Sequence, residues 1–529
     1  MSGAPRLPSP STGEVLRPWG RSRRRLWLPV ACLIAGAHFA TFEITRLPIA
    51  TDVRFYLYFA ARTADGAVPH RDFFDHKTQL ATFAGAAFHK IGTTIGVDPL
   101  IAIRAGFLVL AGLGAVLMLA VFRRLMNGRA AAGVIAMLPY LGFAVLGTLP
   151  ATGNVPKLIM ALMASAAALA AYHRRWMLAG AAGFLAFMDW QPGLLVFGAV
   201  FVAALFDARG RAAAMTRTLA GLAAAAVPFV IYFAWNGALS NMLDQLFSPS
   251  LAKATQHMQA RTLGFWSRFR HERIWQAVEA VCPGYEWLVY VGLAGLVLFL
   301  ILVIRFWRQP RVRLMLIVLG LYHYGIVAFC LLDFQWLGDL FILLHSAAFF
   351  GGAAIVVVSE FIAWLIARAG LLRRRIGMRT AIAFRVAALL GLAVVIRPSI
   401  LRAPHVLATG NGKPIRMTLA DQREVCERLF HDIHGKRLAF AARAEMLFLA
   451  GEKNGLHTVF WNMAPQAYYR NSDDEGLWDT LARLVEEADA DVVVWDQRMQ
   501  IHPRLAPRYQ ERSYVSESGA YRIRLYARD

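Results

Sequence analysis

The sequence is poor in cysteine and in charged residues, and each shortage excludes a class of protein. Its 529 residues include four cysteines, and only Cys426 lies beyond residue 400, which excludes a C-terminal domain built on a disulfide framework. A bridge from Cys282 to Cys426 stays open, because Cys32 and Cys330 lie in apolar segments. Charged residues make up 17% of the chain, against roughly 25% in soluble proteins. The chain is therefore not an ordinary soluble protein.

Hydrophobic residues take the place of the missing charge. They make up 57% of the sequence, and the mean hydropathy is +0.46. A helix needs roughly 20 apolar residues to cross a bilayer. Runs that approach or reach this length lie at 108–121, 130–149, 219–235, 288–304, 314–332 and 341–358. The sequence therefore predicts a mainly α-helical, polytopic membrane bundle.

The net charge of +22 belongs to this membrane part of the chain. Residues 401–529 carry 18 basic and 18 acidic residues, so the whole excess lies in the first 400 positions. There the basic residues collect in short connections between apolar runs, which is the pattern that fixes topology in a membrane. We therefore expect a membrane protein and no nucleic-acid partner.

The arginine clusters predict the sidedness of the protein. Lys and Arg resist translocation, so each cluster is expected on the cytoplasmic side, together with residues 1–25. The clusters lie at 21–25, 123–129, 174–175, 209–217, 305–313 and 368–375. Their alternation closes with about eleven spans, near 26–45, 99–122, 130–149, 156–172, 176–189, 191–206, 215–235, 286–307, 312–332, 336–358 and 380–397. We expect an integral protein of the bacterial inner (plasma) membrane with a cytoplasmic N-terminus.

Two segments leave alternatives open. The fifth and sixth spans are short and meet at Asp189-Trp-Gln-Pro-Gly193, so a helical hairpin that reaches partway competes with two full crossings. The first apolar run, 26–42, competes with a cleaved signal peptide, although no small-residue cleavage pattern follows it. Both alternatives keep the arginine clusters on one side.

Two regions outside the predicted spans are too long to be simple connections. The spans form a domain over 26–399, whose outer loop covers 46–98 and reads as two amphipathic helices, 52–65 and 74–91. Such helices lie in the membrane interface, with aromatic residues such as Phe55 and Phe59 toward the acyl chains. Residues 400–529 alternate strand-like and helix-like segments and predict a small extracytoplasmic α/β domain. Strands are expected at 437–443, 458–462, 491–496 and 521–528, and helices at 444–455 and 476–490.

Asp52 follows the first span directly, at the predicted outer surface. A carboxylate at the water boundary stays ionised and can accept a proton from an attacking hydroxyl, as a general base does. The same residue type at the start of a helix commonly caps it, and spacing alone favours that second reading. Both readings stay open for Asp52 at this point.

A polar stretch from Pro69 to Gln79 shifts the balance toward chemistry. It places cations suited to phosphate beside carboxylate and amide groups suited to sugar hydroxyls: Arg71, Asp72, Asp75, His76, Lys77 and Gln79. A solvated helix face would have a similar composition. Asp75 and His76 resemble metal ligands, but no third ligand has a suitable spacing, so no metal site is predicted.

These residues resemble a known family. Thr51-Asp52 with Phe55-Tyr56, followed by Gly66-Ala-Val-Pro-His-Arg-Asp-Phe-Phe-Asp-His-Lys77, is similar to the first outer loop of the GT-C superfamily of polyprenyl-phosphate-sugar-dependent glycosyltransferases. The likeness extends to 179–187 with 191–195, to 334–339, and to the predicted topology with its C-terminal domain. It is nearest to bacterial relatives of dolichyl-phosphate-mannose mannosyltransferases. The implied fold is a GT-C-like bundle with a small C-terminal α/β domain.

The resemblance implies roles for particular positions. Asp52 matches the base that activates the acceptor, and Arg71 and Lys77 match positions where cations hold the donor phosphate. Asp72, Asp75, His76, Gln79, Asp189, Gln191 and Gln335 are expected to bind substrate. Val53 replaces a second acidic residue of many members, His70 replaces a Tyr, and Thr78-Gln79 replaces a Pro. These departures leave altered substrate choice or lost activity open.

The implied reaction is an inverting transfer of a sugar from a polyprenyl-phosphate-sugar donor to a hydroxyl of a glycan, lipid or protein acceptor. The polyprenyl phosphate leaves readily once cations offset its charge, so a nucleotide site is not needed. Nothing indicates a cofactor, although a divalent cation stays open. A lipid-linked saccharide flippase, or an inactive scaffold of the same fold, is the alternative.

Overall fold

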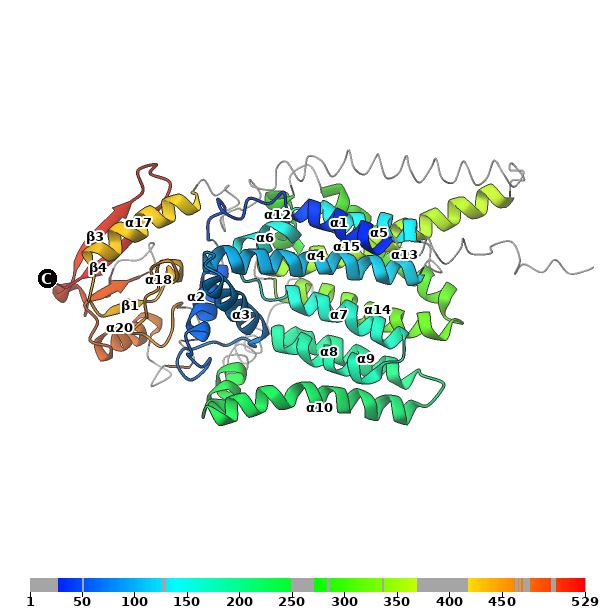
Figure 1. Ribbon diagram of the computed structural model, residues 1–529, viewed down its shortest axis with the longest axis horizontal. Helices are drawn as coiled ribbons and strands as arrows, with labels where there is room; N and C mark the ends of the chain where they lie inside the picture. The colour runs from blue at the N-terminus through cyan, green and yellow to red at the C-terminus, as the bar shows by residue number, and fades with distance from the viewer. Residues whose placement is uncertain are drawn as a thin grey trace, which may run out of the picture.

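A computed structural model describes most of the chain. The described residues are 27–49, 52–125, 130–248, 271–282, 286–334, 337–368, 417–461, 465, 468–469, 476–495 and 501–528. They form a long helical bundle with a small domain at one end (Figure 1). The fold class predicted from the sequence is therefore confirmed.

Helices occupy the first ten predicted spans. They are α1 (Trp27–Phe39), α4 (Pro99–Leu125), α5 (Ala130–Gly142) with α6 (Val145–Thr152), α7 (Leu158–Tyr172), α8 (Trp176–Asp189), α9 (Leu194–Leu205), α10 (Arg211–Trp235), α13 (Glu286–Phe306), α14 (Pro310–Leu332) and α15 (Leu337–Arg368). The short helix α12 (His271–Val281) precedes α13. The eleventh predicted span, 380–397, lies outside the described residues. Because α1 packs on α4, the first apolar run is part of the bundle.

The bundle has the character of a membrane protein. Five described helices, α4, α10, α13, α14 and α15, contain stretches long and apolar enough to cross a bilayer, with mean hydropathies from 1.8 to 2.8. Large apolar side chains on their outer faces are exposed, among them Val109, Ile231 and Ile304. Exposed apolar surface on this scale is stable in lipid and not in water. The chain is therefore an integral membrane protein.

The hairpin at Asp189 consists of two short helices. Helix α8 ends at Asp189, Trp190 is extended, and the 3-10 turn η2 (Gln191–Gly193) leads into α9. The helices have 14 and 12 residues, which at about 1.5 Å per residue is roughly 21 and 18 Å. A Cβ on Gly193 would lie 2.1 Å from the Ala186 carbonyl oxygen, so only glycine permits this tight return. Both helices are therefore shorter than the hydrocarbon layer of a bilayer, which is roughly 30 Å thick. This length fits the alternative of a hairpin that reaches only partway across.

The described arginine clusters meet at one end of the bundle. Arg124 lies 3.3 Å from the His173 ring, and Arg175 and Arg311 also act electrostatically on this ring. Arg174 pairs with Asp207 at 3.2 Å, and Arg313 donates to the Phe206 carbonyl at 3.1 Å. Basic residues from three connections thus lie with residues 206–207 of a fourth at the end of the bundle opposite the small domain, the end that the sequence expects on the cytoplasmic side.

The predicted outer loop contains α2 (Val53–Ala64) and α3 (Leu80–Thr94). The first helix lies where the sequence places it, but the second begins at Leu80 and not at Phe74. Residues 69–79 instead form a compact turn in which His70 has a left-handed backbone with φ 68°. The Asp75 carboxylate accepts the Lys77 backbone N–H at 2.9 Å, which stabilises the turn against helix.

The C-terminal domain is a small mixed sheet with helices. It comprises α17 (Leu419–Asp432), β1 (Leu438–Phe440), α18 (Ala444–Ala450), α20 (Leu477–Glu487), β2 (Val492–Val494), the turn η5 (Ala506–Arg508), β3 (Gln510–Val515) and β4 (Arg522–Ala527). The strand order is β1-β2-β4-β3, with β1 parallel to β2 and the other pairs antiparallel.

Several sequence expectations for this domain were wrong. The described residues 458–461 form no strand, because Asn454 binds the carbonyls of Phe440 and Thr458 and turns the chain away from the sheet. The pattern also missed α17, and it missed β3 because the exposed residues of that strand hide the two-residue alternation. Cys282 and Cys426 are both free and buried, so the bridge left open by the sequence does not form.

The aromatic residues of α2 face the C-terminal domain and not acyl chains. Tyr58 and Phe59 are buried at 4% and 1% exposure, in one core cluster with residues of α17, α18 and β4. The ring centroid of Phe55 lies 5.1 Å from that of Phe460. The interfacial orientation expected for these residues was wrong, because the domain supplies the apolar surface that the lipid would have supplied. Figure 1 shows α2 against α18 at this junction.

Candidate functional site

Asp52 stands at the start of α2 with its side chain exposed. It occupies the N-cap position, but its backbone is already helical and its carboxylate makes no capping hydrogen bond. The carboxylate has no hydrogen bond or ion pair with any residue that the structure describes. Asp52 therefore does not cap α2, although spacing alone favours that role. Its carboxylate is available to a ligand.

Tyr56 marks where the acidic residues converge. It lies one helical turn after Asp52 and is partly exposed. Burial of the hydroxyl, together with the carboxylates of Asp75, Asp52, Asp189 and Asp339, raises the pKa of Tyr56 well above 10. These residues come from α2, the 69–79 turn, α8 and α15, so the fold gathers at one end of the bundle groups that lie far apart in sequence. The sequence analysis used Tyr56 in the family resemblance but gave it no role in the site, because an aromatic in an amphipathic helix carries no signal of such a role.

Asp75 is the buried centre of the 69–79 turn. Its exposure is 1%, and its carboxylate accepts the Gln79 side-chain amide at 3.0 Å in addition to the Lys77 backbone N–H. Burial raises the pKa of Asp75 to about 7, although these hydrogen bonds and the Lys77 charge favour the ionised form. Asp75 is thus placed to hold the turn that presents Lys77, which is half-buried.

Gln245 braces this turn from the far side and was not predicted. Its side chain lies on a helical segment at 239–248 and is fully buried. Its carbonyl oxygen accepts the Asp75 backbone N–H at 3.1 Å, and its amide donates to the His70 carbonyl at 2.9 Å. Burial lowers the pKa of His70 to about 4, so its ring is neutral near pH 7. A lone Gln in a long loop gives no signal in the sequence.

Arg71 and Asp72 pair with one another. The Arg71 guanidinium donates two hydrogen bonds of 2.8 Å to the two Asp72 oxygens, and a third of 3.3 Å to the Asn236 carbonyl. Asp72 also accepts the Val68 N–H at 2.7 Å. Both side chains are partly exposed at the edge of the turn. Arg71 therefore has a partner that offsets its charge before any phosphate is bound.

Asp189 caps α7. Its carboxylate accepts the backbone N–H groups of Lys157 and Met160, each at 2.8 Å. Lys157 has a left-handed backbone with φ 85°, and its ammonium lies 2.6 Å from Asp339 and 4.3 Å from the Trp190 ring centroid. A lysine with a positive φ has a strained backbone, so the surrounding contacts must hold Lys157 in this conformation. The capping bonds give Asp189 a structural role beside the substrate role expected of it.

Gln191 links the hairpin to the outer loop. Its amide donates to the His76 carbonyl at 2.7 Å, so two predicted site residues lie side by side. Gln335 lies outside the described residues. Among the residues that the structure describes, no three His, Cys, Asp or Glu side chains converge in a way that could hold a metal ion.

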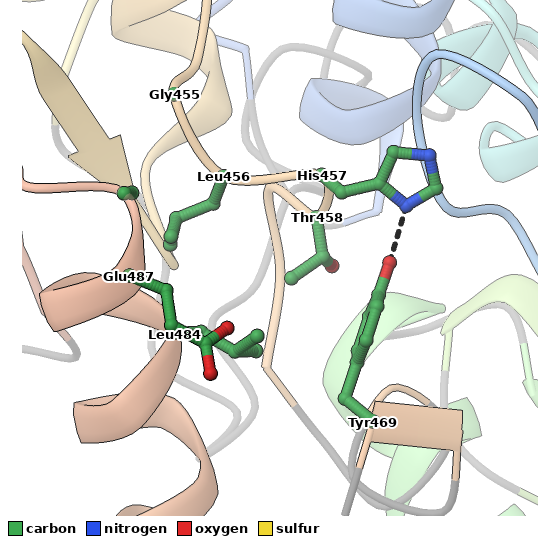
Figure 2. Close-up of a pocket in the computed structure, with 8 residues that line it drawn as sticks. Gly455, Leu456, His457, Thr458, Tyr469, Leu484 and Glu487 are labelled. Carbon is green, nitrogen blue, oxygen red and sulfur yellow. Dashed lines mark hydrogen bonds between the residues drawn. The ribbon is translucent and has the colours of Figure 1, made fainter.

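A pocket of roughly 210 Å³ lies in the C-terminal domain, and Asp52 is not among the residues that line it. Figure 2 shows His457 turned toward the Tyr469 hydroxyl, with Leu456, Leu484 and Glu487 across the pocket. The other nitrogen of the His457 ring binds the Arg71 carbonyl at 2.9 Å. Since both ring nitrogens have protein partners, His457 joins the domain to the outer loop.

The fold is similar to that of solved structures. No protein-family model and no curated protein matches the sequence. The structure of ArnT from Cupriavidus metallidurans bound to undecaprenyl phosphate is similar, with a TM-score of 0.53 and 14% sequence identity over 96% of this chain and 98% of ArnT. The apo structure of the same protein gives a TM-score of 0.52 and 13% identity over 95% and 97%. The chain therefore shares the fold of ArnT over nearly its whole length.

Proposed function

We propose that the protein transfers a sugar, with inversion, from a polyprenyl-phosphate-sugar donor to an acceptor hydroxyl at the outer face of the membrane. The observation that carries the proposal is the Asp52 carboxylate, which is exposed and has no hydrogen bond or ion pair with any described residue, at the junction of bundle, outer loop and C-terminal domain. A carboxylate without such a partner is suited to accept the proton of an attacking hydroxyl. The likeness in fold to ArnT, whose structure held undecaprenyl phosphate, supports a polyprenyl-phosphate partner.

In this reaction the acceptor oxygen attacks the anomeric carbon from the face opposite the phosphate. Asp52 takes the hydroxyl proton as the new C–O bond forms, and the bond to the phosphate oxygen breaks. The leaving phosphate gains negative charge, which Lys77 and Arg71 are proposed to offset. Asp72, Asp75, His76, Gln79, Asp189, Gln191 and Gln335 remain proposed substrate contacts, directly or through the turn that they build.

The test is Asp52→Asn in the full-length protein reconstituted in nanodiscs. Donors are undecaprenyl phosphates that carry mannose, glucose or another sugar, and the acceptor source is membrane from a strain that lacks the protein. We expect transfer to fall by roughly 10²- to 10⁴-fold, the range that general base catalysis contributes. The affinity for undecaprenyl phosphate should stay within about twofold. Unchanged transfer by Asp52→Asn would remove the base assignment.

One observation favours a flippase as the second candidate. Between α14 and α15, His323 is hydrogen-bonded to the Ser346 hydroxyl at 3.0 Å, and its ring stacks on that of His345 with the ring centroids 5.9 Å apart. Both ring nitrogens of His345 are buried without a hydrogen bond in the described structure. Buried ionisable groups inside a bundle are common in transport pathways. A flippase would move fluorescent undecaprenyl phosphate across vesicles equally well with Asp52 or Asp52→Asn, whereas a transferase would not need to move it.

A further inference from the structure

The C-terminal domain holds the backbone on both sides of Asp52. Three residues before Asp52, Ile49 is buried at 1% exposure and is bound by a side chain of α17. Six residues after it, the Tyr58 hydroxyl accepts the backbone N–H of Asn454 at 3.0 Å. Asp52 therefore lies between two positions, Ile49 and Tyr58, that the domain binds by hydrogen bonds.

Gln422 binds the first of these positions. Its side chain is fully buried, and its amide pairs with the peptide of Ile49 as a second strand would. The Ile49 N–H donates to the Gln422 side-chain oxygen at 2.8 Å, and the Gln422 amide nitrogen donates to the Ile49 carbonyl at 2.9 Å. Glutamine alone among the common side chains of this length offers both a donor and an acceptor. The Arg46 carbonyl accepts the Leu419 N–H at 3.1 Å close by.

The position of Gln422 is itself fixed. Helix α17 begins with a capping box in which Thr418 and Asp421 exchange hydrogen bonds of 3.2 and 2.6 Å. Asp421 also accepts a hydrogen bond from Ser518 in the β3–β4 turn. The chain of contacts therefore runs from the sheet through the start of α17 to the Ile49 peptide, with each step hydrogen-bonded.

We propose that Gln422 is a positioning residue for Asp52, so that the C-terminal domain is part of the catalytic apparatus and not an appendage. Ile49 is three residues from Asp52, a reach of at most about 10 Å. A base must lie within hydrogen-bond distance of the proton that it removes, and displacement by about 1 Å can cost roughly 10²-fold in rate. This inference rests on the proposed function, because it concerns the alignment of the proposed base.

The experiment compares Gln422→Leu, Gln422→Glu and Glu427→Gln in full-length protein in nanodiscs. Glu427 is an exposed residue of the same helix and serves as the matched control. We expect Gln422→Leu to lower kcat by roughly 10–10²-fold, with KM for the donor lipid within about twofold. Gln422→Glu, which keeps an acceptor for the Ile49 N–H but loses the donor, should fall between Gln422→Leu and the wild type.

A double variant separates positioning from a general loss of stability. If Gln422 acts through Asp52, Gln422→Leu has no further effect on turnover once Asp52→Asn is present. Effects that multiply in the double variant overturn the proposal, and so does a wild-type kcat in Gln422→Leu. Hydrogen exchange of a peptide spanning residues 45–58 should be at least about tenfold faster in Gln422→Leu, while β1–β4 keep their protection.

The two proposals fail in different ways. A wild-type protein that transfers no sugar from any donor overturns the proposed function and the base role together. An active wild type whose Asp52→Asn variant is inactive, but whose Gln422→Leu variant turns over normally, overturns the positioning role alone.

Discussion

At the scale of single residues, burial and pairing decide what each polar group near the junction can do. Asp52 is exposed and has no partner among the described residues, whereas the carboxylates of Asp75 and Asp189 accept hydrogen bonds that hold a turn and a helix end. The same carboxylate group is therefore proposed to act as a base at one position and stabilises local structure at two others. The sequence did not show these structural roles of Asp75 and Asp189, because they depend on which backbone N–H groups reach each carboxylate.

Asp75 predicts how stability depends on pH. Burial raises its pKa from 3.8 to about 7 in the folded protein. A raised pKa means that the folded state holds its proton where the unfolded state has lost it. The contribution of Asp75 to the free energy of unfolding is therefore largest below about pH 4. It falls by roughly 4 kcal/mol in total as the pH rises to about 7, and it stays constant above that pH.

The measurement for Asp75 is thermal unfolding in detergent between pH 4 and 8. The wild type should lose stability across this window, and Asp75→Asn should lose much less, since its side chain does not titrate. Equal pH profiles for the two proteins would show that other groups dominate the dependence.

The ion pair between Lys157, at the start of α7, and Asp339, in α15, should stabilise the contact between these two helices. The Lys157 ammonium is 15% exposed, and its partner Asp339 is 3% exposed. Lys157→Met removes the positive partner of a buried carboxylate, which should lower the free energy of unfolding by about 3 kcal/mol. Lys157→Met combined with Asp339→Leu should recover part of this loss, measured by denaturant unfolding. A double variant less stable than Lys157→Met would contradict the pairing.

At the scale of helices, glycine sets how closely neighbours approach. A Cβ on Gly180 in α8 would lie 2.0 Å from the Thr218 carbonyl oxygen of α10, and one on Gly221 would lie 1.9 Å from the Met177 carbonyl oxygen of α8. Because the atoms that a Cβ would meet belong to the backbone, they cannot move aside as a flexible side chain could. Small residues at such crossings are typical of membrane helices, where close backbone contact replaces the hydrophobic effect.

Gly180→Ala tests this packing. Overpacking against a fixed backbone should lower the free energy of unfolding by about 1–3 kcal/mol. Gly198→Ala in α9 is the matched control, because no atom lies within 4 Å of a Cβ built there, and it should change stability little. Thermal unfolding of both variants in the same detergent makes the comparison. Similar losses would contradict a specific contact between α8 and α10.

At the scale of the whole molecule, the fold separates basic and acidic groups to opposite ends. Arginines of three connections lie with residues 206–207 of a fourth at one end, and the acidic groups around Tyr56 lie at the other, beside the C-terminal domain. By the positive-inside rule, we expect the basic end on the cytoplasmic side. The proposed chemistry would then take place outside, where a lipid-linked donor is accessible and nucleotide sugars are not needed.

Substituted-cysteine labelling tests this orientation. In a Cys32→Ser background, the three remaining cysteines are buried, so a new exposed cysteine dominates the labelling. Glu517→Cys, in the C-terminal domain, should react in intact cells with a maleimide that does not cross membranes. Arg209→Cys should react only after lysis. Labelling of Arg209→Cys in intact cells would reverse the predicted topology.

The sequence by itself determined the membrane character and most of the helices, and it predicts the sidedness, because hydropathy and arginine placement act locally and need no knowledge of neighbours. It also singled out Asp52 and the 69–79 stretch as candidates. Only the tertiary structure decided that Asp52 has no partner among the described residues, that Asp189 caps α7, and that the aromatics of α2 meet a protein domain. These facts depend on contacts between residues as far apart as Ile49 and Gln422. A pattern along the chain carries no record of such contacts, because they are made by the packing of the whole fold.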